Sequence, residues 1–297
     1  MSGRHIHPDR SATAAVRRAA LHHAASAERA LGRSRLSDWQ VHQARKQIKK
    51  SRAALRLLRA AMPQPTYRRE DAALRSAAHA LNAARDARVL LRTLESLCRR
   101  RAAFGRDTAA AALSKLLRRR QTQALHQLRQ QPALLSAARA TLRQLQLRAP
   151  RWRLGQLGWQ LLRHGFKRIY RGGRRGARAA KRRSDAFTMH QWRKQVQYLS
   201  HALQILKPLQ SRMPSKTAAV ARRLADYLGE AHDLALLRST ASAFGQSHEP
   251  LGEEIQAAIE RRRAVLQLKA IAAGKRLYAR KPRAMAARAC ERPRTAV

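Results

Sequence analysis

The sequence is poor in aromatic residues and cysteine, and each shortage excludes a class of protein. Aromatic side chains make up only 4% of the 297 residues, and β-branched residues are few, so a strand-based fold is not expected. The two cysteines, Cys98 and Cys290, are too far apart in sequence to form a metal or redox motif, which excludes a disulfide scaffold. No uncharged stretch reaches the roughly 18 residues of a membrane span, and residues 1–31 lack the apolar core of a secretory signal.

Acidic residues are also scarce, and this imbalance predicts a polyanionic partner. The chain has 17 Asp and Glu against 64 Lys and Arg, a formal net charge of +47 at pH 7. Such a charge repels itself unless bound anions neutralise it. Nucleic acid, inorganic polyphosphate, heparin-like polymers and anionic membranes all carry the required charge, and composition does not choose among them. Because 44% of residues are apolar, largely Ala and Leu, we expect a folded, all-helical protein of the reducing cytoplasm.

Proline and glycine divide the chain into helical segments. Ser37 and Gln40 fit a capping box that begins one of them. The glycine-rich segment 171–176 is expected to be a loop, residues 1–10 a disordered N-terminus, and residues 276–297 a basic disordered tail. Helices are predicted over residues 12–31, 37–61, 68–101, 107–129, 132–147, 154–170, 185–206, 215–244 and 250–273.

Two pairs of matching segments indicate an internal duplication. The segment from His42 to Ile48 returns from His190 to Val196, an offset of 148 residues, and the segment ending at Asp86 returns at Asp233, an offset of 147. We therefore expect one unit over residues 11–275, with similar halves at about 11–150 and 151–275.

A single-sign line of cations runs along the helix that contains His42. At about 100° per residue, Arg45, Lys49, Arg52 and Arg56 fall within about 80° of His42. Lys46 and Lys50 widen the line, and an apolar stripe of Val41, Ile48, Leu55 and Leu58 runs beside it. The second copy keeps His190, Arg193 and Lys194 but has Gln197, Ser200 and Gln204 in place of the later cations. The apolar stripe predicts packing, and the cations predict contacts with phosphate or a solvated face.

The pattern His-x-x-Arg-Lys-x-x-Lys-x-x-Arg from His42 to Arg52 resembles the motif of the CHAD domain (conserved histidine α-helical domain), and residues 190–194 echo it. The resemblance implies two four-helix bundles related by pseudo-twofold symmetry around a basic channel. It also implies binding of inorganic polyphosphate and recruitment to polyphosphate granules. The residues expected to bind polyphosphate are His42, Arg45, Lys46, Lys49, Lys50, Arg52, Arg56, Arg85, Arg171, Arg174, Arg175, Arg178, His190, Arg193 and Lys194.

Rival functions remain open on the residues alone. A nucleic-acid-binding helical protein would use the same phosphate contacts, although single-strand binders usually offer stacking aromatics. A phosphotransfer or phosphohydrolase enzyme would need grouped acidic residues, which are scarce, so we expect no catalytic residues, no metal and no cofactor. Asp86 and Asp233 are expected to orient cations of the two motif helices, and the four tryptophans are expected to lie in the core. Oligomeric state is not indicated.

Overall fold

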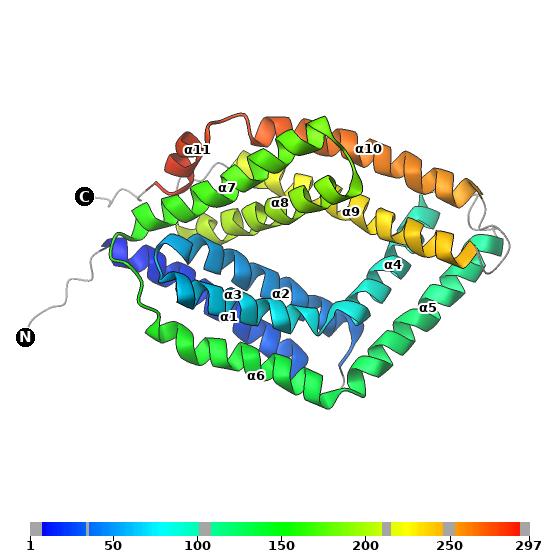
Figure 1. Cartoon of the computed structure of the whole chain (residues 1–297), viewed down its shortest axis with the longest axis horizontal. Helices are drawn as coiled ribbons and strands as arrows, with labels where there is room; N and C mark the ends of the chain where they lie inside the picture. Colours follow the sequence, from blue (N-terminus) through cyan, green and yellow to red (C-terminus); the bar gives the residue numbers. More distant parts are fainter. Residues whose placement is uncertain (1–7, 34–35, 101–107, 210–214, 246–252, 292–297) are drawn as a thin grey trace, which may run out of the picture.

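The computed structural model describes residues 8–33, 36–100, 108–209, 215–245 and 253–291, and these residues contain helices and no strand. The all-α prediction is therefore confirmed (Figure 1). The α-helices are α1 (Pro8–Leu31), α2 (Asp38–Leu57), α3 (Gln64–His79), α4 (Asn82–Arg99), α5 (Thr108–Arg129), α6 (Pro132–Arg148), α7 (Gly158–Arg182), α8 (Ala186–Leu206), α9 (Ser215–Gly245), α10 (Glu253–Leu277) and α11 (Pro282–Ala289). Short 3-10 helices η1 (Leu58–Ala60), η3 (Ala149–Arg151) and η4 (Lys207–Leu209) follow α2, α6 and α8.

Two groups of four helices form the body of the molecule. In the first group α1 packs on α2 and α6, and α3 packs on α2 and α6. In the second group α7, α8, α9 and α10 pack in sequence, and α10 returns to α7. Contacts of α2 with α8 and of α1 with α7 join the groups, so the two helices that carry the repeated histidine motif lie against each other (Figure 1). A pseudo-twofold relation between the groups stays a prediction.

Helices α4 and α5 leave the first group and close a second core. Leu94 of α4 and Leu113 of α5 are buried with Leu237 of α9 and Ile259 of α10. Figure 1 shows α4 and α5 running from the first group towards the ends of α9 and α10. This second core therefore joins α4 and α5 to α9 and α10.

Helix α2 forms as its sequence predicts. Ser37 has an extended backbone, its hydroxyl accepts a hydrogen bond from Gln40 N–H, and Gln40 Oε1 accepts one from Ser37 N–H at 2.6 Å. This reciprocal capping box satisfies donors that the first turn leaves free. Val41, Ile48 and Leu55 of the apolar stripe are each at most 1% exposed. The stripe thus anchors α2 and turns its cationic line away from the core.

The helix predicted over residues 68–101 is wrong as a single element. The chain breaks between α3 and α4 at Ala80 and Leu81, and Leu81 is fully buried. Neither residue disfavours helix, so no local signal marks the break. Its second copy, around Leu228, lies inside the uninterrupted helix α9.

The glycine-rich segment 171–176 is helical, which corrects the predicted loop. It forms the middle of α7, where the glycines allow close approach of other elements. A Cβ on Gly173 would lie 2.2 Å from Tyr278 Oη, and one on Gly176 would lie 2.8 Å from Trp192 Cδ1. Glycine is needed at these positions because any larger residue would collide with the packed neighbours. The conformational freedom of the glycine backbone is not the reason.

The chain beyond residue 276 is ordered where the structure describes it, unlike the expected disordered tail. Helix α11 packs on α7 and buries Met285 and Ala289, and Cys290 follows it into the core. Tyr170 of α7 donates its hydroxyl to the carbonyl oxygens of Leu277 and Arg280, at 2.9 and 3.1 Å. Residues 292–297 lie outside the described residues, as do residues 1–7 of the expected disordered N-terminus, whose residues 8–10 begin α1.

The tryptophans follow the prediction with one exception. Trp152, Trp159 and Trp192 are at most 7% exposed, whereas Trp39 is 60% exposed at the start of α2. No helix in the described parts of the chain is long and apolar enough to cross a membrane.

Candidate polyanion-binding cavity

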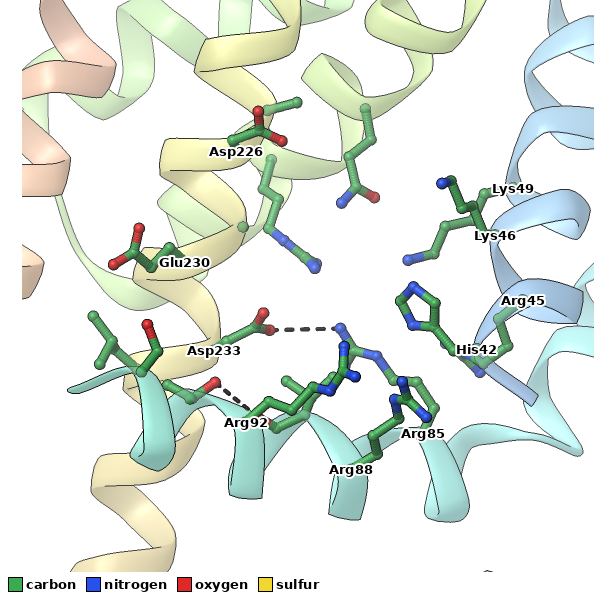
Figure 2. A pocket seen from close by; sticks show the side chains of 18 of the residues that line it. His42, Arg45, Lys46, Lys49, Arg85, Arg88, Arg92, Asp226, Glu230 and Asp233 are labelled. Carbon is green, nitrogen blue, oxygen red and sulfur yellow. Dashed lines mark hydrogen bonds and ion pairs between the residues drawn. The ribbon is translucent and has the colours of Figure 1, made fainter. Parts of the chain in front are cut away.

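An open cavity of about 500 Å³, which we call the main cavity, lies between α2, α4, α8 and α9 (Figure 2). Its lining contains nine Lys or Arg side chains against three Asp or Glu. The cations are Arg45, Lys46 and Lys49 from α2, Arg85, Arg88 and Arg92 from α4, Arg100 after it, Arg193 from α8 and Arg262 from α10. The structure thus brings the first half of the predicted cationic line together with Arg193 of the second copy.

Helix α4 supplies as many cations as α2. Arg85, Arg88 and Arg92 are spaced three and four residues apart, so they share one face, and all three side chains point into the cavity (Figure 2). Of these, only Arg85 was expected at the site. The spacing of the three arginines was visible in the sequence and indicates a shared helical face, but the break before α4 is what turns that face to the cavity.

Arg45 connects the site to the break between α3 and α4. Its Nη1 donates to the carbonyl oxygen of Ala78 at 2.5 Å and also to Oδ1 of Asn82. These two acceptors lie on opposite sides of the break, so Arg45 ties the end of α3 and the start of α4 to α2. Arg45 therefore supports the cavity wall as well as its charge.

The acidic side chains of the cavity come from α9 and balance only part of the charge. Asp233 accepts from Arg85 Nη2 at 3.5 Å, and Arg85 also pairs with Asp86 at 2.7 Å. Glu230 pairs with Arg262 at 2.7 Å. Asp86 and Asp233 were predicted to orient cations of the motif helices, but the cation with which both form ion pairs is Arg85 of α4, which corrects that prediction. Within the described residues, no carboxylate forms an ion pair with Lys49, Arg88, Arg92 or Arg193.

Burial removes several cavity cations from water, and this loss of hydration disfavours their charged forms. Burial, together with neighbouring arginines, lowers the pKa of Lys49 from 10.5 to about 7 and that of Arg45 to about 10. Burial also lowers the pKa of Arg193. The Nε atoms of Arg45, Arg88 and Arg193 are buried without a hydrogen-bond partner among the described residues. Buried donors of this kind are stabilised by an anion that accepts from them.

The histidines around the cavity are neutral near pH 7. Burial first, and nearby cations second, lower the pKa of His42 to about 4. His201 also lines the cavity, and burial lowers its pKa to about 4. His190 does not line the cavity and lies against His232 with the ring centroids 4.7 Å apart. A neutral His42 offers one N–H to a ligand, and an added negative charge would raise its pKa.

The distal part of the predicted cationic line on α2 is not in the main cavity. Arg52 donates its Nε to Asp71 at 3.0 Å, and Arg56 lies over the ring of Tyr198, 3.9 Å from its centroid. Lys50 lines a separate small cavity with His23. The helical wheel placed Arg52 and Arg56 on the cationic face and Lys50 at its edge, and contacts with different neighbouring helices separate the three side chains.

The basic residues of α7 and the remaining motif residue are also spread out. Arg175 lines a second cavity described below. Arg171 and Arg178 are exposed and Arg174 is half-buried, and none of the three lines either cavity. Lys194 is exposed and lies outside both cavities. Nowhere in the described residues do three His, Cys, Asp or Glu side chains group as a metal site would require.

The sequence matches one protein family model, and the architecture is similar to that of solved structures. The family model described as CHAD domain matches residues 15–242. No curated protein matches the sequence. Among solved structures, PptA from Streptomyces chartreusis is similar with a TM-score of 0.62 at 14% identity, over 90% of this chain and 98% of that chain. The CHAD domain from the plant Ricinus communis is similar with a TM-score of 0.61 at 20% identity, over 90% and 91% of the two chains. At these identities the likeness shows the fold.

Proposed function

Because the chain belongs to the CHAD domain family, we propose that its main cavity binds inorganic polyphosphate and thereby directs the protein to polyphosphate granules in the cytoplasm. The observation that carries the proposal is the excess of cations in one cavity lined by both motif helices, α2 and α8. Guanidinium groups bind phosphate oxygens in pairs, and Lys46 and Lys49 add point charges. The proposal is binding without turnover, so incubation with Mg²⁺ should release no orthophosphate.

The cavity chemistry favours polyphosphate over nucleic acid. No Phe, Tyr or Trp is among the described residues that line it, so no ring is available for a base to stack on. Its floor carries unpartnered Arg donors, which a chain made only of phosphates can satisfy along its whole length. A nucleic acid would instead have to place bases against charged walls.

Competition between ligands tests this choice. Long-chain polyphosphate is titrated into the protein at fixed salt, in the presence of duplex DNA or RNA of equal total charge. We expect polyphosphate binding to survive the competitor and to weaken steeply as salt rises, because bound cations release counterions. Equal competition by nucleic acid would favour the nucleic-acid function, and a flat salt dependence would contradict an electrostatic cavity.

A charge-matched pair of variants locates the site. Lys46→Gln, Arg88→Gln and Arg92→Gln together remove three cavity cations that form no ion pair among the described residues. Each lost charge-assisted contact is worth about 1.5–3 kcal/mol before compensation, so affinity should fall by about a hundredfold or more. The control variant carries Lys115→Gln, Arg119→Gln and Arg120→Gln on the exposed face of α5. Equal losses in the two variants would show general attraction rather than a cavity.

A further inference from the structure

A second basic cavity, of about 420 Å³, lies between the end of α2, α7 and α8, and shares no lining residue with the main cavity. We call it the α7 cavity. Its described lining contains cations, amides and small residues, and no carboxylate or aromatic side chain. The lining residues are Arg56, Arg59, Arg168, Ile169, Gly172, Arg175, Gly176, Ala179, Gln191 and Gln195.

The sequence of α7 builds one wall of this cavity. Arg168, Gly172 and Arg175 are spaced four and three residues apart, so they lie on one helical face. A Cβ on Gly172 would lie 2.7 Å from Oε1 of Gln195, so the missing side chain leaves room for the Gln195 amide against α7. The amide of Gln195 therefore lines the cavity together with the exposed side chains of Arg168 and Arg175.

The opposite wall holds two arginines in place on aromatic rings. The Arg56 guanidinium lies 3.9 Å from the Tyr198 ring centroid, and that of Arg59 lies 4.7 Å from the ring of Tyr67. Arg56 Nε is buried without a hydrogen-bond partner among the described residues. Stacking fixes both side chains before any ligand arrives, which reduces the entropy lost on binding.

The charge of the α7 cavity is less balanced than that of the main cavity. No ion pair among the described residues involves Arg56, Arg59, Arg168 or Arg175. Along α2, the residue between the two cavities is Arg52, and its pairing with Asp71 interrupts the line of free cations. The α7 cavity is therefore a separate positive site and not an extension of the main one.

We propose that the α7 cavity binds a condensed phosphate of pyrophosphate or triphosphate size through the guanidinium groups of Arg56, Arg59, Arg168 and Arg175. Four forked donors facing one space suit a compact anion with many oxygens, and the two glutamine amides can donate to the oxygens that remain. The same chemistry is offered by free pyrophosphate or triphosphate and by a segment of a longer chain. The proposal does not depend on ligand binding in the main cavity.

The test uses two double variants of α7 that remove equal charge. Arg168→Gln with Arg175→Gln changes the α7 cavity, whereas Arg163→Gln with Arg182→Gln changes exposed cations of the same helix outside it. Pyrophosphate is titrated calorimetrically into each variant, made in the background of the main-cavity triple variant so that the α7 cavity is observed alone. Circular dichroism and thermal unfolding confirm that each protein is folded.

We expect the cavity variant to bind pyrophosphate at least about tenfold more weakly than the matched control. A parallel titration with long-chain polyphosphate distinguishes a free short phosphate from a segment of a longer chain. If the cavity binds chain segments, the cavity variant binds long-chain polyphosphate more weakly than its control, while the two variants bind pyrophosphate equally. Three results would overturn the proposal: equal affinities in the two variants for both ligands, equal weakening in both, or loss of all binding in the main-cavity background. Should the double variant not fold, Arg59→Gln alone gives the same comparison from the opposite wall.

Discussion

Lys49 should take up a proton when polyphosphate binds, and this uptake reports directly on the main cavity. Burial, reinforced by three arginines and partly opposed by Asp233, lowers its pKa from 10.5 to about 7 in the free protein. The charged and titratable groups that face Lys49 are His42 and Arg45 on α2, Arg85 on α4, Arg193 and His201 on α8, and His232 and Asp233 on α9. A bound phosphate chain adds negative charge beside the ammonium group, and therefore raises this pKa again.

The size of the effect follows from the two pKa values. Between 7 and 10.5 the unfolded chain keeps a proton on Lys49 that the folded, ligand-free protein has lost, so ligand-free stability should increase with pH in this window. At 1.36 kcal/mol per pH unit, keeping Lys49 charged in the empty cavity costs at most on the order of 5 kcal/mol. If polyphosphate restores the ordinary pKa, each pH unit of acidification between 10.5 and 7 strengthens binding by up to about tenfold.

Calorimetry in buffers of different ionisation enthalpy counts the protons. At about pH 8.5 we expect uptake of about one proton per protein through Lys49, because the free side chain is then mostly neutral and the bound one mostly charged. The histidines contribute little there, since the pKa of His42 is about 4. Lys49→Gln should abolish this proton uptake, whereas binding of polyphosphate should become weaker but stay measurable.

Two results of the proton-uptake measurement would contradict this prediction. Equal proton uptake by the wild-type protein and Lys49→Gln would mean that another group titrates, and no uptake in either would mean that the ligand does not approach Lys49. Either result would refute the reasoning that places phosphate beside this side chain.

Three further predictions concern stability. Gly165→Ala should destabilise the fold by about 3 kcal/mol or more in urea unfolding, because its Cβ would lie 2.1 Å from the carbonyl oxygen of Leu57. Gly229→Ala is its control: a Cβ there meets nothing within 4 Å, so the helix propensity of alanine should stabilise the protein by about 0.5–1 kcal/mol. Glu70→Gln should lower the free energy of unfolding by about 3 kcal/mol in the same assay, because this fully buried carboxylate accepts two hydrogen bonds from Arg148. An unchanged urea midpoint would contradict this structural role.

The parts of the fold that depend on local patterns were predictable. The capping box at Ser37, the apolar stripe of α2 and the proline at the start of α6 each act within a few residues, so the sequence alone contains their physical cause. The glycines of α7 were misinterpreted because their reason lies far away in sequence, at Trp192 and Tyr278. Helix α11 was missed for the same reason, since only packing on α7 distinguishes it from a basic tail.

The candidate site was predictable from α2 and much less so from its other walls. Helical periodicity placed Arg45 and Lys49 on one face, and both line the main cavity. It could not show that Arg52 is paired with Asp71, because that carboxylate lies on another helix. The contribution of Arg88 and Arg92 depends on the break before α4, which no residue preference indicates.

The unbalanced charge of the main cavity also has a consequence for how long the protein lasts. A fold that holds cations together without enough carboxylates gains stability from any polyanion that binds only its folded form. Proteases degrade a chain largely through its transiently unfolded population, so the same ligand lengthens the lifetime of the protein. Under the proposed function, the abundance of the protein would then rise and fall with the amount of polyphosphate in the cell, without any change in the rate of synthesis.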